Sequence, residues 1–550
     1  MKLAILSNVN LEPLKGHLQK ANAAAAHFSP YGQHLIELLD QGSVIHRQEA
    51  LDALFVHLDA EELLKDDLFG LPRPDSAEAG LKEVLDALQG FCERRSQVNV
   101  IVSTLSLPPF SCLTHLDSNS PHSHSAVEQQ LNRLLRDFAA RRRNVFLLDF
   151  SRLLRLHGAN AFHDDKYWYL GRIKYTHAGF RALAEELSCL WAAISGKARK
   201  VLVLDLDNTL WGGVLGEDGP GGLQLGEDGL GKAYRDFQKA IQGLKSLGVL
   251  LAINSKNNES DVRDFFASSP MMVLRYEDFV SRKVNWNNKV ENLREIADEL
   301  NLGVDSFVMI DDSAAERALV KQYVPEVATP DFPKDPAQLK RWFLSDVVYR
   351  HFSRVALTAE DLRKSEQYER NVKRRELGAG LNLKEFIASL EIRLVVKKND
   401  PQTLQRIAQL TQKTNQFNLT TLRLNHADLE HRLTAGSYNI YGLEYEDRFG
   451  PEGLIGTCLV ERQANAAHVV NFLLSCRVLG RNVEYRFLVH VLRDLHQAGI
   501  ARINAEFIPS PKNNVAREFY PQAGLTPLPD GRFEGEVAGL IDHLELSYAV

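Results

Sequence analysis

The stretch that most constrains this chain runs from Val201 to Gly213 and reads Val-Leu-Val-Leu-Asp-Leu-Asp-Asn-Thr-Leu-Trp-Gly-Gly. Its first four residues are apolar and partly β-branched. Because this run is too short for a helix, it predicts a strand buried on both faces. Asp205 ends the strand and Asp207 follows two residues later. Two carboxylates this close repel each other, and a divalent cation such as Mg²⁺, which prefers carboxylate oxygen, removes that conflict. A lone Asp-x-Asp pair also occurs in caps and turns.

Two further apolar runs downstream predict buried strands that end in polar side chains. One runs from Val249 to Ser255, and the other runs from Ser306 to Asp312. In a doubly wound sheet, ligands bind beyond the carboxyl ends of the parallel strands. We therefore expect one crevice to collect the side chains that follow these strands, namely Asp205, Asp207, Ser255, Asp311 and Asp312.

Four groups of residues resemble, in order, the motifs of the haloacid dehalogenase (HAD) phosphohydrolases: Asp205-x-Asp207-x-Thr209, Ser255, Lys289 and Asp311-Asp312. By this resemblance, Asp205 is the nucleophile that takes up a phosphoryl group, and Asp207 is the general acid–base. The ammonium of Lys289 lowers the repulsion between a carboxylate and a phosphate dianion. Taken singly, each residue also fits an ordinary role, such as a surface lysine or a capping serine. Four motifs in the right order after three apolar strands favour the phosphatase site.

The same resemblance implies substrate and metal ligands. It implies that Thr209, Asn254 and Ser255 bind the phosphorylated substrate, and that Mg²⁺ is the cofactor. The implied metal ligands are Asp205, Asp207 (through its backbone carbonyl), Asp311 and Asp312. The glycine-rich stretch between Trp211 and Leu230 permits a flap but is too short for a separate cap domain. Such an uncapped site accepts a large or protein-attached substrate.

The N-terminal part, residues 1–195, alternates short apolar runs with helical patterns, which predicts a parallel α/β domain. The arrangement resembles the SGNH hydrolase fold, with Ser7 after the first strand and His177 near the end. However, Lys174 stands where that family's Asp-x-x-His needs an acid. Without an acid to orient the imidazole, Ser7 is poorly activated. We therefore expect a docking domain rather than an active hydrolase. The predicted strands are Leu3–Leu6, Ala53–His57, Val98–Val102 and Val145–Leu148.

The C-terminal part, residues 391–550, carries several strands and a loop, Arg477-x-x-Gly480-x-Asn482, at the start of a helix. This loop resembles the pyrophosphate loop of the GNAT acyltransferases, and backbone N–H groups at a helix N-terminus favour anions. Asn482 departs from that family, which usually has Gly or Ala there. A phosphopantetheine arm or a phosphate suits the loop better than acetyl-CoA. An upstream loop rich in amides either binds a polar ligand or satisfies its own turns; its candidates are Asn415, Gln416 and Asn418.

The five cysteines are scattered, odd in number and free of any C-x-x-C pair, which fits reduced thiols in a cytoplasmic protein. Cys476 precedes Arg477 and Arg481 and lies where a strand meets a helix. Both features favour the thiolate and therefore nucleophilicity. A buried, unreactive cysteine is the alternative that composition alone favours.

The chain has 550 residues, and its length and patterns predict a multidomain α/β protein. The expected parts are an SGNH-like domain (1–195), a HAD-like domain (196–350), a solvated helical linker (351–390) and a GNAT-like α+β domain (391–550). The net charge of −6 provides no overall basic field for nucleic acid. No apolar run is long enough for a signal peptide or a membrane span. The sequence therefore predicts neither a nucleic-acid partner nor a membrane partner.

This combination resembles the FkbH-like family of the HAD superfamily (subfamily IIIC) over nearly the whole chain. That resemblance implies an enzyme that dephosphorylates 1,3-bisphosphoglycerate and loads the glyceryl group onto an acyl carrier protein. The transfer passes through a thioester on Cys476, in polyketide or related biosynthesis, with Arg477, Gly480 and Arg481 binding the phosphopantetheine arm or the phosphorylated donor. Ser313-Ala314 departs from the family's usual Asn-Pro. A simple phosphatase and a non-enzymatic scaffold remain as alternatives.

Overall fold

The computed structural model describes residues 2–20, 24–48, 50–108, 110–357, 370, 374, 377, 382–463, 465–529 and 531–548. Contacts divide the chain into two compact units. The first contains residues 1–191 with 425–428, and the second contains residues 192–424 with 429–550. Most of the predicted linker, 351–390, lies outside the described residues, and its last part forms the helix α21 (Leu383–Leu390).

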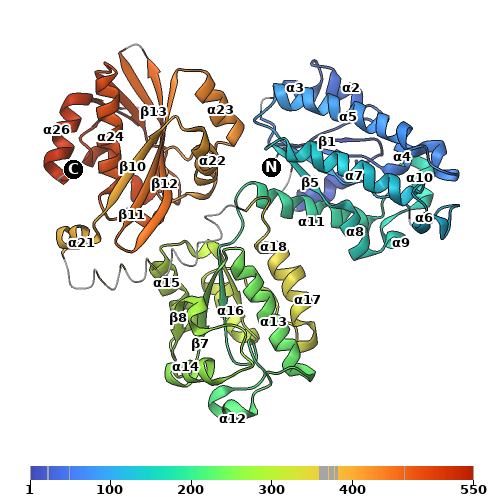
Figure 1. Ribbon diagram of the computed structural model, residues 1–550, viewed down its shortest axis with the longest axis horizontal. Helices are drawn as coiled ribbons and strands as arrows, with labels where there is room; N and C mark the ends of the chain where they lie inside the picture. Colours follow the sequence, from blue (N-terminus) through green and yellow to red (C-terminus); the bar gives the residue numbers. More distant parts are fainter. Residues whose placement is uncertain are drawn as a thin grey trace. The chain divides into compact units, whose positions relative to one another are not determined.

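A five-stranded parallel sheet organises the first unit, with the strand order β2-β1-β3-β4-β5. Four of its strands lie where the apolar runs predict them, whereas β2 was not predicted because its alanines are helix formers. The helices α5 and α7 pack on one face of the sheet (Figure 1). The strands are β1 (Lys2–Ser7), β2 (Ala24–Phe28), β3 (Ala53–His57), β4 (Asn99–Ser103) and β5 (Val145–Leu148). The helices are α1 (Leu14–Lys20), α2 (His34–Leu39), α3 (Val44–Arg47), α4 (Ala60–Leu64), α5 (Pro74–Arg94), α6 (Leu116–Asn119), α7 (His124–Ala140), α8 (Phe150–His157), α9 (Ala159–Phe162), α10 (Asp165–Gly171) and α11 (His177–Ile194).

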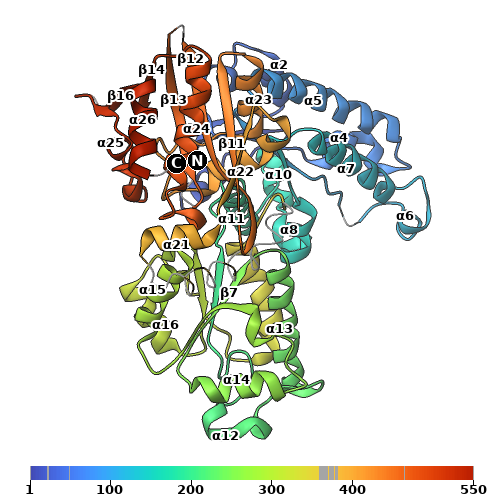
Figure 2. The same ribbon diagram turned by 60° about the vertical axis from the view of Figure 1, so that its left-hand side comes forward.

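The second unit begins with a four-stranded parallel sheet in the order β8-β7-β6-β9, which we call the phosphatase-like domain. Its strands are β6 (Val201–Leu204), β7 (Leu250–Ser255), β8 (Phe279–Val284) and β9 (Phe307–Ile310). Side chains of β6 alternate between two apolar clusters, one with α13 and α17 and the other with α15 and α16. Figure 2 shows α15 and α16 on one side of β7 and α13 on the other. Both faces are therefore covered, as an apolar parallel strand requires. The helices are α12 (Leu215–Gly222), α13 (Gly229–Ser246), α14 (Glu259–Ser268), α15 (Lys289–Leu300), α16 (Ala314–Tyr323), α17 (Leu339–Trp342) and α18 (Tyr349–His351).

The C-terminal domain is built on a mixed sheet in the order β10-β11-β12-β13-β14-β16-β15. Its pairs are antiparallel except β13 with β14, which run parallel and are joined through α24. Helices α24 and α26 cover one face and α22 and α23 the other. The strands are β10 (Arg393–Lys398), β11 (Tyr438–Asp447), β12 (Gly450–Gln463), β13 (Ala466–Leu474), β14 (Arg502–Glu506), β15 (Thr526–Pro527) and β16 (Arg532–Glu536). The helices are α22 (Leu404–Lys413), α23 (His426–Thr434), α24 (Val483–Gln497), α25 (Phe519–Gln522) and α26 (Val537–Tyr548).

The prediction of a multidomain α/β architecture is confirmed. Within the part of the chain that the structure describes, no helix combines the length and the apolar character needed to cross a membrane.

Candidate functional site

The strand register brings two predicted acids together at the carboxyl edge of the phosphatase-like sheet. Leu204 of β6 pairs with Ile310 of β9, and the Asp205 amide donates to the Ile310 carbonyl at 3.0 Å. Asp205 and Asp311 therefore leave neighbouring parallel strands at the same level. The side chain of Asp311 is fully buried, and that of Asp205 is nearly so.

Lys289 lies between these two carboxylates. Its ammonium is 2.8 Å from an Asp205 oxygen and 2.5 Å from an Asp311 oxygen, and the residue is only 3% exposed. Lys289 is the first residue of α15, where the Asn288 side chain caps the helix by accepting the Val290 amide. Burial lowers the pKa of Lys289, but the charges of Asp205 and Asp311 outweigh it and hold the pKa above the usual value. The lysine is therefore a fixed cation at the centre of the site, not a surface residue.

Asp312 joins the same group, which makes a carboxylate cluster. Ligand atoms of Asp205, Asp311 and Asp312 all lie within 4.8 Å of one another. Burial and then the charge of Asp205 raise the pKa of Asp311 to about 6, although Lys289 opposes this shift. The same two causes raise the pKa of Asp312. Three convergent carboxylates fit a hard divalent cation such as Mg²⁺, because its charge relieves their repulsion. These residues are the ones that would hold the ion.

The side chain of Asp207 lies apart from this cluster and is held by three donors. Its carboxylate accepts hydrogen bonds from the Trp211 indole at 2.9 Å, the Leu215 amide at 3.0 Å and the Asn257 amide group at 2.9 Å. The chain between Asp207 and Leu215 turns at the predicted glycine pair, Gly212 and Gly213. Gly213 has a φ of 100°, a conformation that a residue with a Cβ adopts only with strain. Asp207 is thus oriented separately from the metal-binding oxygens.

Asn257 was not predicted from the sequence, although it lies two residues after Ser255. Its buried amide donates to Asp207 and, at 3.3 Å, to the hydroxyl of Ser255. It therefore joins two of the predicted motifs. The signal that could have found it is the polar run Asn254-Ser-Lys-Asn257 directly after an apolar strand.

Three predicted substrate-binding residues have different surroundings. Ser255 is buried at the end of β7 beside Asn257. Thr209 is fully buried, and its hydroxyl has no hydrogen-bond partner among the described residues. Asn254 is also fully buried, donating to the Lys289 carbonyl at 2.9 Å and accepting from Asn292 at 3.0 Å. These contacts make Asn254 a residue that positions Lys289 rather than one that faces the substrate.

The loop after β9 shows why Ser313-Ala314 can replace Asn-Pro. The Ser313 hydroxyl caps α16, and Asp311 accepts the Ser313 amide at 2.9 Å. Serine is a good N-cap, and alanine is compatible with the first helical turn. Arg317, a second residue not predicted, donates to the carbonyl oxygens of Asp311 and Asp312 at 2.7 and 2.8 Å. The backbone that carries the two carboxylates is therefore held in place by a residue of the following helix, α16.

In the C-terminal domain, two residues of the loop after β13 have left-handed backbone conformations. Gly480 has a φ of 76°, and Asn482, which directly precedes α24 as its N-cap residue, has a φ of 57°. Asparagine is among the few residues besides glycine that tolerate this left-handed conformation. The replacement of the usual small residue by Asn482 therefore preserves the turn.

The predicted ligand-binding residues of this domain separate into two groups. Asn415, Gln416 and Arg477 line one cavity. Arg481 and Asn418 are buried inside the domain instead. The Arg481 guanidinium donates to the Tyr445 hydroxyl at 3.0 Å, and the Asn418 carbonyl accepts from Asn513. The contacts of Arg481 and Asn418 fit a structural role better than ligand binding.

Cys476 begins the short helix η7 (Cys476–Val478) directly after β13. Its thiol lies outside what the structure describes, and its reactivity stays a prediction. Among the other cysteines, burial raises the pKa of Cys92 to about 11, and it raises the pKa of Cys458 as well. Both are therefore unreactive thiols of the kind that structural cysteines provide.

Three residues of the predicted SGNH-like motifs, Ser7, Lys174 and His177, have contacts that the structure describes. The Ser7 hydroxyl accepts the Val9 amide at 3.1 Å. Lys174 forms ion pairs with Asp59 at 2.8 Å and Glu61 at 2.7 Å. The ring of His177 lies 4.4 Å from that of His17. The role of this part of the chain as a docking domain stays a prediction.

Neither protein-family models nor curated proteins give a significant match to the chain. Among solved structures, the chain is similar to the N-terminal part of the protein BF1531 from Bacteroides fragilis, which contains a phosphatase domain and was crystallised with Mg. The two are 28% identical, the match covers 65% of this chain and 95% of that one, and the TM-score is 0.59.

Weaker matches include the ribosomal-protein-S18-alanine N-acetyltransferase from Escherichia coli and the PaiA N-acetyltransferase from Thermoplasma acidophilum. Each covers 26% of this chain, and the matches cover 94% and 99% of those proteins at 11% and 12% identity. Their TM-scores of 0.21 are too low to support a comparison. The chain is therefore similar, over about two thirds of its length, to a phosphatase-domain protein crystallised with Mg.

Proposed function

We propose that this protein is a Mg²⁺-dependent HAD-type phosphatase that is also an acyltransferase. It dephosphorylates 1,3-bisphosphoglycerate and loads the glyceryl group, through a thioester on Cys476, onto the phosphopantetheine arm of an acyl carrier protein. The observation that carries the phosphatase part is the cluster of Asp205, Asp311 and Asp312 around Lys289 at the carboxyl edge of the sheet. The similarity to a phosphatase domain crystallised with Mg supports the same assignment.

The geometry gives each residue of this centre one task. An Asp205 oxygen attacks the phosphorus, and the leaving oxygen takes a proton from Asp207. Lys289, 2.8 Å from Asp205, offsets the charge that builds up on the transferring group. Asp207 then removes a proton from the water that releases phosphate from Asp205. When bound, Mg²⁺ supplies further positive charge toward the phosphate oxygens.

The acyl-transfer part rests on the sequence around Cys476. The Cys476 thiolate attacks the acyl carbon of the acyl phosphate and expels phosphate, which leaves a thioester. The thiol of the phosphopantetheine arm then attacks that thioester and releases the Cys476 thiolate. A protein-bound acceptor is compatible with the fold, because α12 (Leu215–Gly222) is the only helix between β6 and α13 among the described residues, and no cap domain intervenes.

Intact-protein mass spectrometry after incubation with Mg²⁺ and 1,3-bisphosphoglycerate tests the proposal. We expect a glyceryl adduct on the wild type, none on Cys476→Ala, and a phosphoglyceryl adduct on Asp205→Asn, because dephosphorylation then fails. Cys112→Ala removes an exposed, free thiol and is the matched control that keeps the adduct. Phosphate release without any adduct would reject acyl transfer and leave a simple phosphatase.

Asn257→Ala tests whether the orientation of Asp207 matters. The substitution removes the donors to Asp207 and Ser255, and we expect kcat for phosphate release to fall by about tenfold or more with little change in KM. The control is Asn258→Ala at the neighbouring residue, which bonds Asp261 and Trp286 instead. Equal losses in both variants would show that Asn257 acts only through the local fold. Steady-state kinetics make the measurement.

A further inference from the structure

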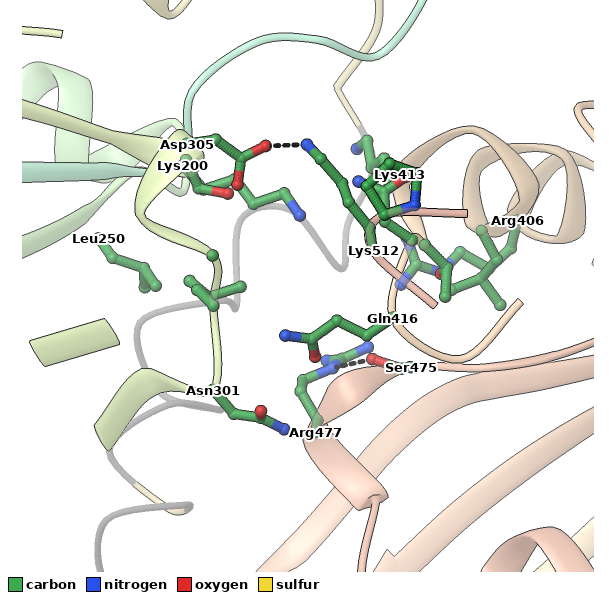
Figure 3. Close-up of a pocket in the computed structure, with 17 residues that line it drawn as sticks. Lys200, Leu250, Asn301, Asp305, Arg406, Lys413, Gln416, Ser475, Arg477 and Lys512 are labelled. Carbon is green, nitrogen blue, oxygen red and sulfur yellow. Dashed lines mark hydrogen bonds and ion pairs between the residues drawn. The ribbon is translucent and has the colours of Figure 1, made fainter. Parts of the chain in front are cut away.

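A cavity lies in the same unit as the phosphatase-like centre, and the proposed catalytic steps do not use it. Its volume is about 340 Å³. Its walls come from the amino edge of the phosphatase-like sheet and, in the C-terminal domain, from helix α22 and neighbouring loops. Figure 3 shows Lys200 and Asp305 on the first side, and Gln416 and Arg477 on the second.

The lining of this cavity is strongly cationic. Five basic side chains lie in the described wall with one acid, Asp305, which forms an ion pair with Lys512. Such a density of cations in a hollow focuses a positive potential, although the whole chain carries a net charge of −6. The basic residues are Lys200, Arg406, Lys413, Arg477 and Lys512.

Uncharged groups complete the cavity. The amides of Asn415 and Gln416 lie in the wall beside apolar side chains that include Leu302 and Leu410. Arg477 also donates to the Ser475 hydroxyl at 3.0 Å and lies 3.5 Å from the carboxylate of Glu452, which fixes its guanidinium at the wall. The lining therefore suits a ligand that has both an anionic group and a neutral, amide-bearing or apolar part.

This cavity is separate from the carboxylate cluster. Lys200 directly precedes β6, whereas Asp205 directly follows it. Five residues of extended chain span roughly 16 Å. Lys200 and Asp205 lie at opposite ends of β6, and the strand keeps them apart. The cavity and the carboxylate cluster are therefore two separate sites.

We propose that this cavity binds a phosphate ester, as a site distinct from the phosphatase centre. The inference rests on the proposed function in one respect. The proposed function involves two candidate ligands that both carry a phosphate ester. One is the pantetheine arm of a carrier protein, and the other is a free phosphorylated acyl donor. In either case Lys200 and Lys512 bind the phosphate and the amides bind the neutral part. Two residues that line the cavity, Ser475 and Arg477, are the sequence neighbours of Cys476.

Calorimetric titration of the full-length Asp205→Asn protein in EDTA tests this site, because these conditions silence the metal centre. The two probes are 4′-phosphopantetheine and 3-phosphoglycerate, titrated separately. We expect Lys200→Glu to weaken binding of the recognised probe by about tenfold or more, since it replaces a charged donor by a like charge. Lys512→Ala tests the opposite wall in the same way. Lys397→Glu, at a partly exposed lysine of β10 that pairs with Glu444 of β11, is the matched control and leaves binding unchanged.

The outcomes distinguish the sources and the two proposals. Lysine-dependent binding of 4′-phosphopantetheine supports the site with the carrier arm as its ligand, and lysine-dependent binding of 3-phosphoglycerate supports it with the free donor. If neither probe binds, or if Lys200→Glu and Lys512→Ala change nothing, the site is rejected. Phosphate release by the wild type is measured separately with p-nitrophenyl phosphate. Its absence would reject the phosphatase assignment and leave the anion site standing.

Discussion

Replacing Asp205 by Asn is expected to reduce phosphate release on the order of 10⁴-fold or more, because the substitution removes the nucleophile. The fold should survive, since Lys289 keeps its 2.5 Å ion pair with Asp311. Removal of Mg²⁺ with EDTA should silence the wild type similarly, because the carboxylate cluster then loses its counter-ion. The measurement is the rate of phosphate release from p-nitrophenyl phosphate, because Cys476 expels the acyl phosphate of 1,3-bisphosphoglycerate without the help of Asp205.

Asp331→Asn is the matched control for this prediction. It neutralises an exposed carboxylate of the same domain, paired with Lys321, and should leave the rate within about twofold of the wild type. Circular dichroism would verify that both variants are folded. A rate above one tenth of the wild-type rate in Asp205→Asn would exclude Asp205 as the nucleophile. It would also remove the basis of the HAD assignment.

Replacing Lys289 by Met is expected to destabilise the phosphatase-like domain by about 3–5 kcal/mol in the absence of Mg²⁺. The substitution leaves the buried carboxylates of Asp205 and Asp311 facing each other without a counter-charge. Millimolar Mg²⁺ should recover part of this loss, because the cation then supplies the missing positive charge. Thermal unfolding with and without Mg²⁺ makes the measurement.

Lys283→Met is the control that separates burial from charge. Lys283 also contacts two carboxylates, Glu295 at 2.7 Å and Glu299 at 2.6 Å, but both glutamates are substantially exposed. Its loss should cost at most about 1 kcal/mol and should not respond to Mg²⁺. Equal destabilisation by the two substitutions, or a Lys289→Met loss that Mg²⁺ leaves unchanged, would contradict the placement of Lys289 inside a metal-binding cluster.

The sequence was most informative about the phosphatase-like centre. Each of its motifs follows an apolar run, and in a parallel sheet such runs end at one edge. Strand order was not needed for that argument, because Asp205 and Asp311 leave the sheet on the same side whatever their neighbours. The same reasoning could not predict β2 or β8. The residues of these two strands, Ala-Ala-Ala-His-Phe and Phe-Val-Ser-Arg-Lys-Val, do not form an apolar run that distinguishes a strand from a helix or a loop.

Side-chain direction was beyond the sequence. Asn254 and Ser255 are consecutive residues with different surroundings. The Asn254 side chain forms hydrogen bonds with Lys289 and Asn292, whereas Ser255 lies beside Asn257. The residues that orient the site, Asn257 and Arg317, contact it through partners 50 and 6 residues away in the chain. Arg481 belongs to a promising loop but donates to Tyr445 inside the domain. Hydrogen-bond partners of this kind depend on packing between elements, which local patterns do not encode.

The motifs and their spacing were enough to predict a cluster of carboxylates and the edge of the sheet at which it lies. Periodicity and strand-end polarity are local properties, and they survive without knowledge of the fold. Only the tertiary structure decided that Lys289 is buried between two carboxylates, because that depends on how α15 docks beside β6 and β9. It also decided that five basic residues from distant parts of the chain meet around one cavity. Charges scattered through an acidic sequence become a site only when folding brings them together.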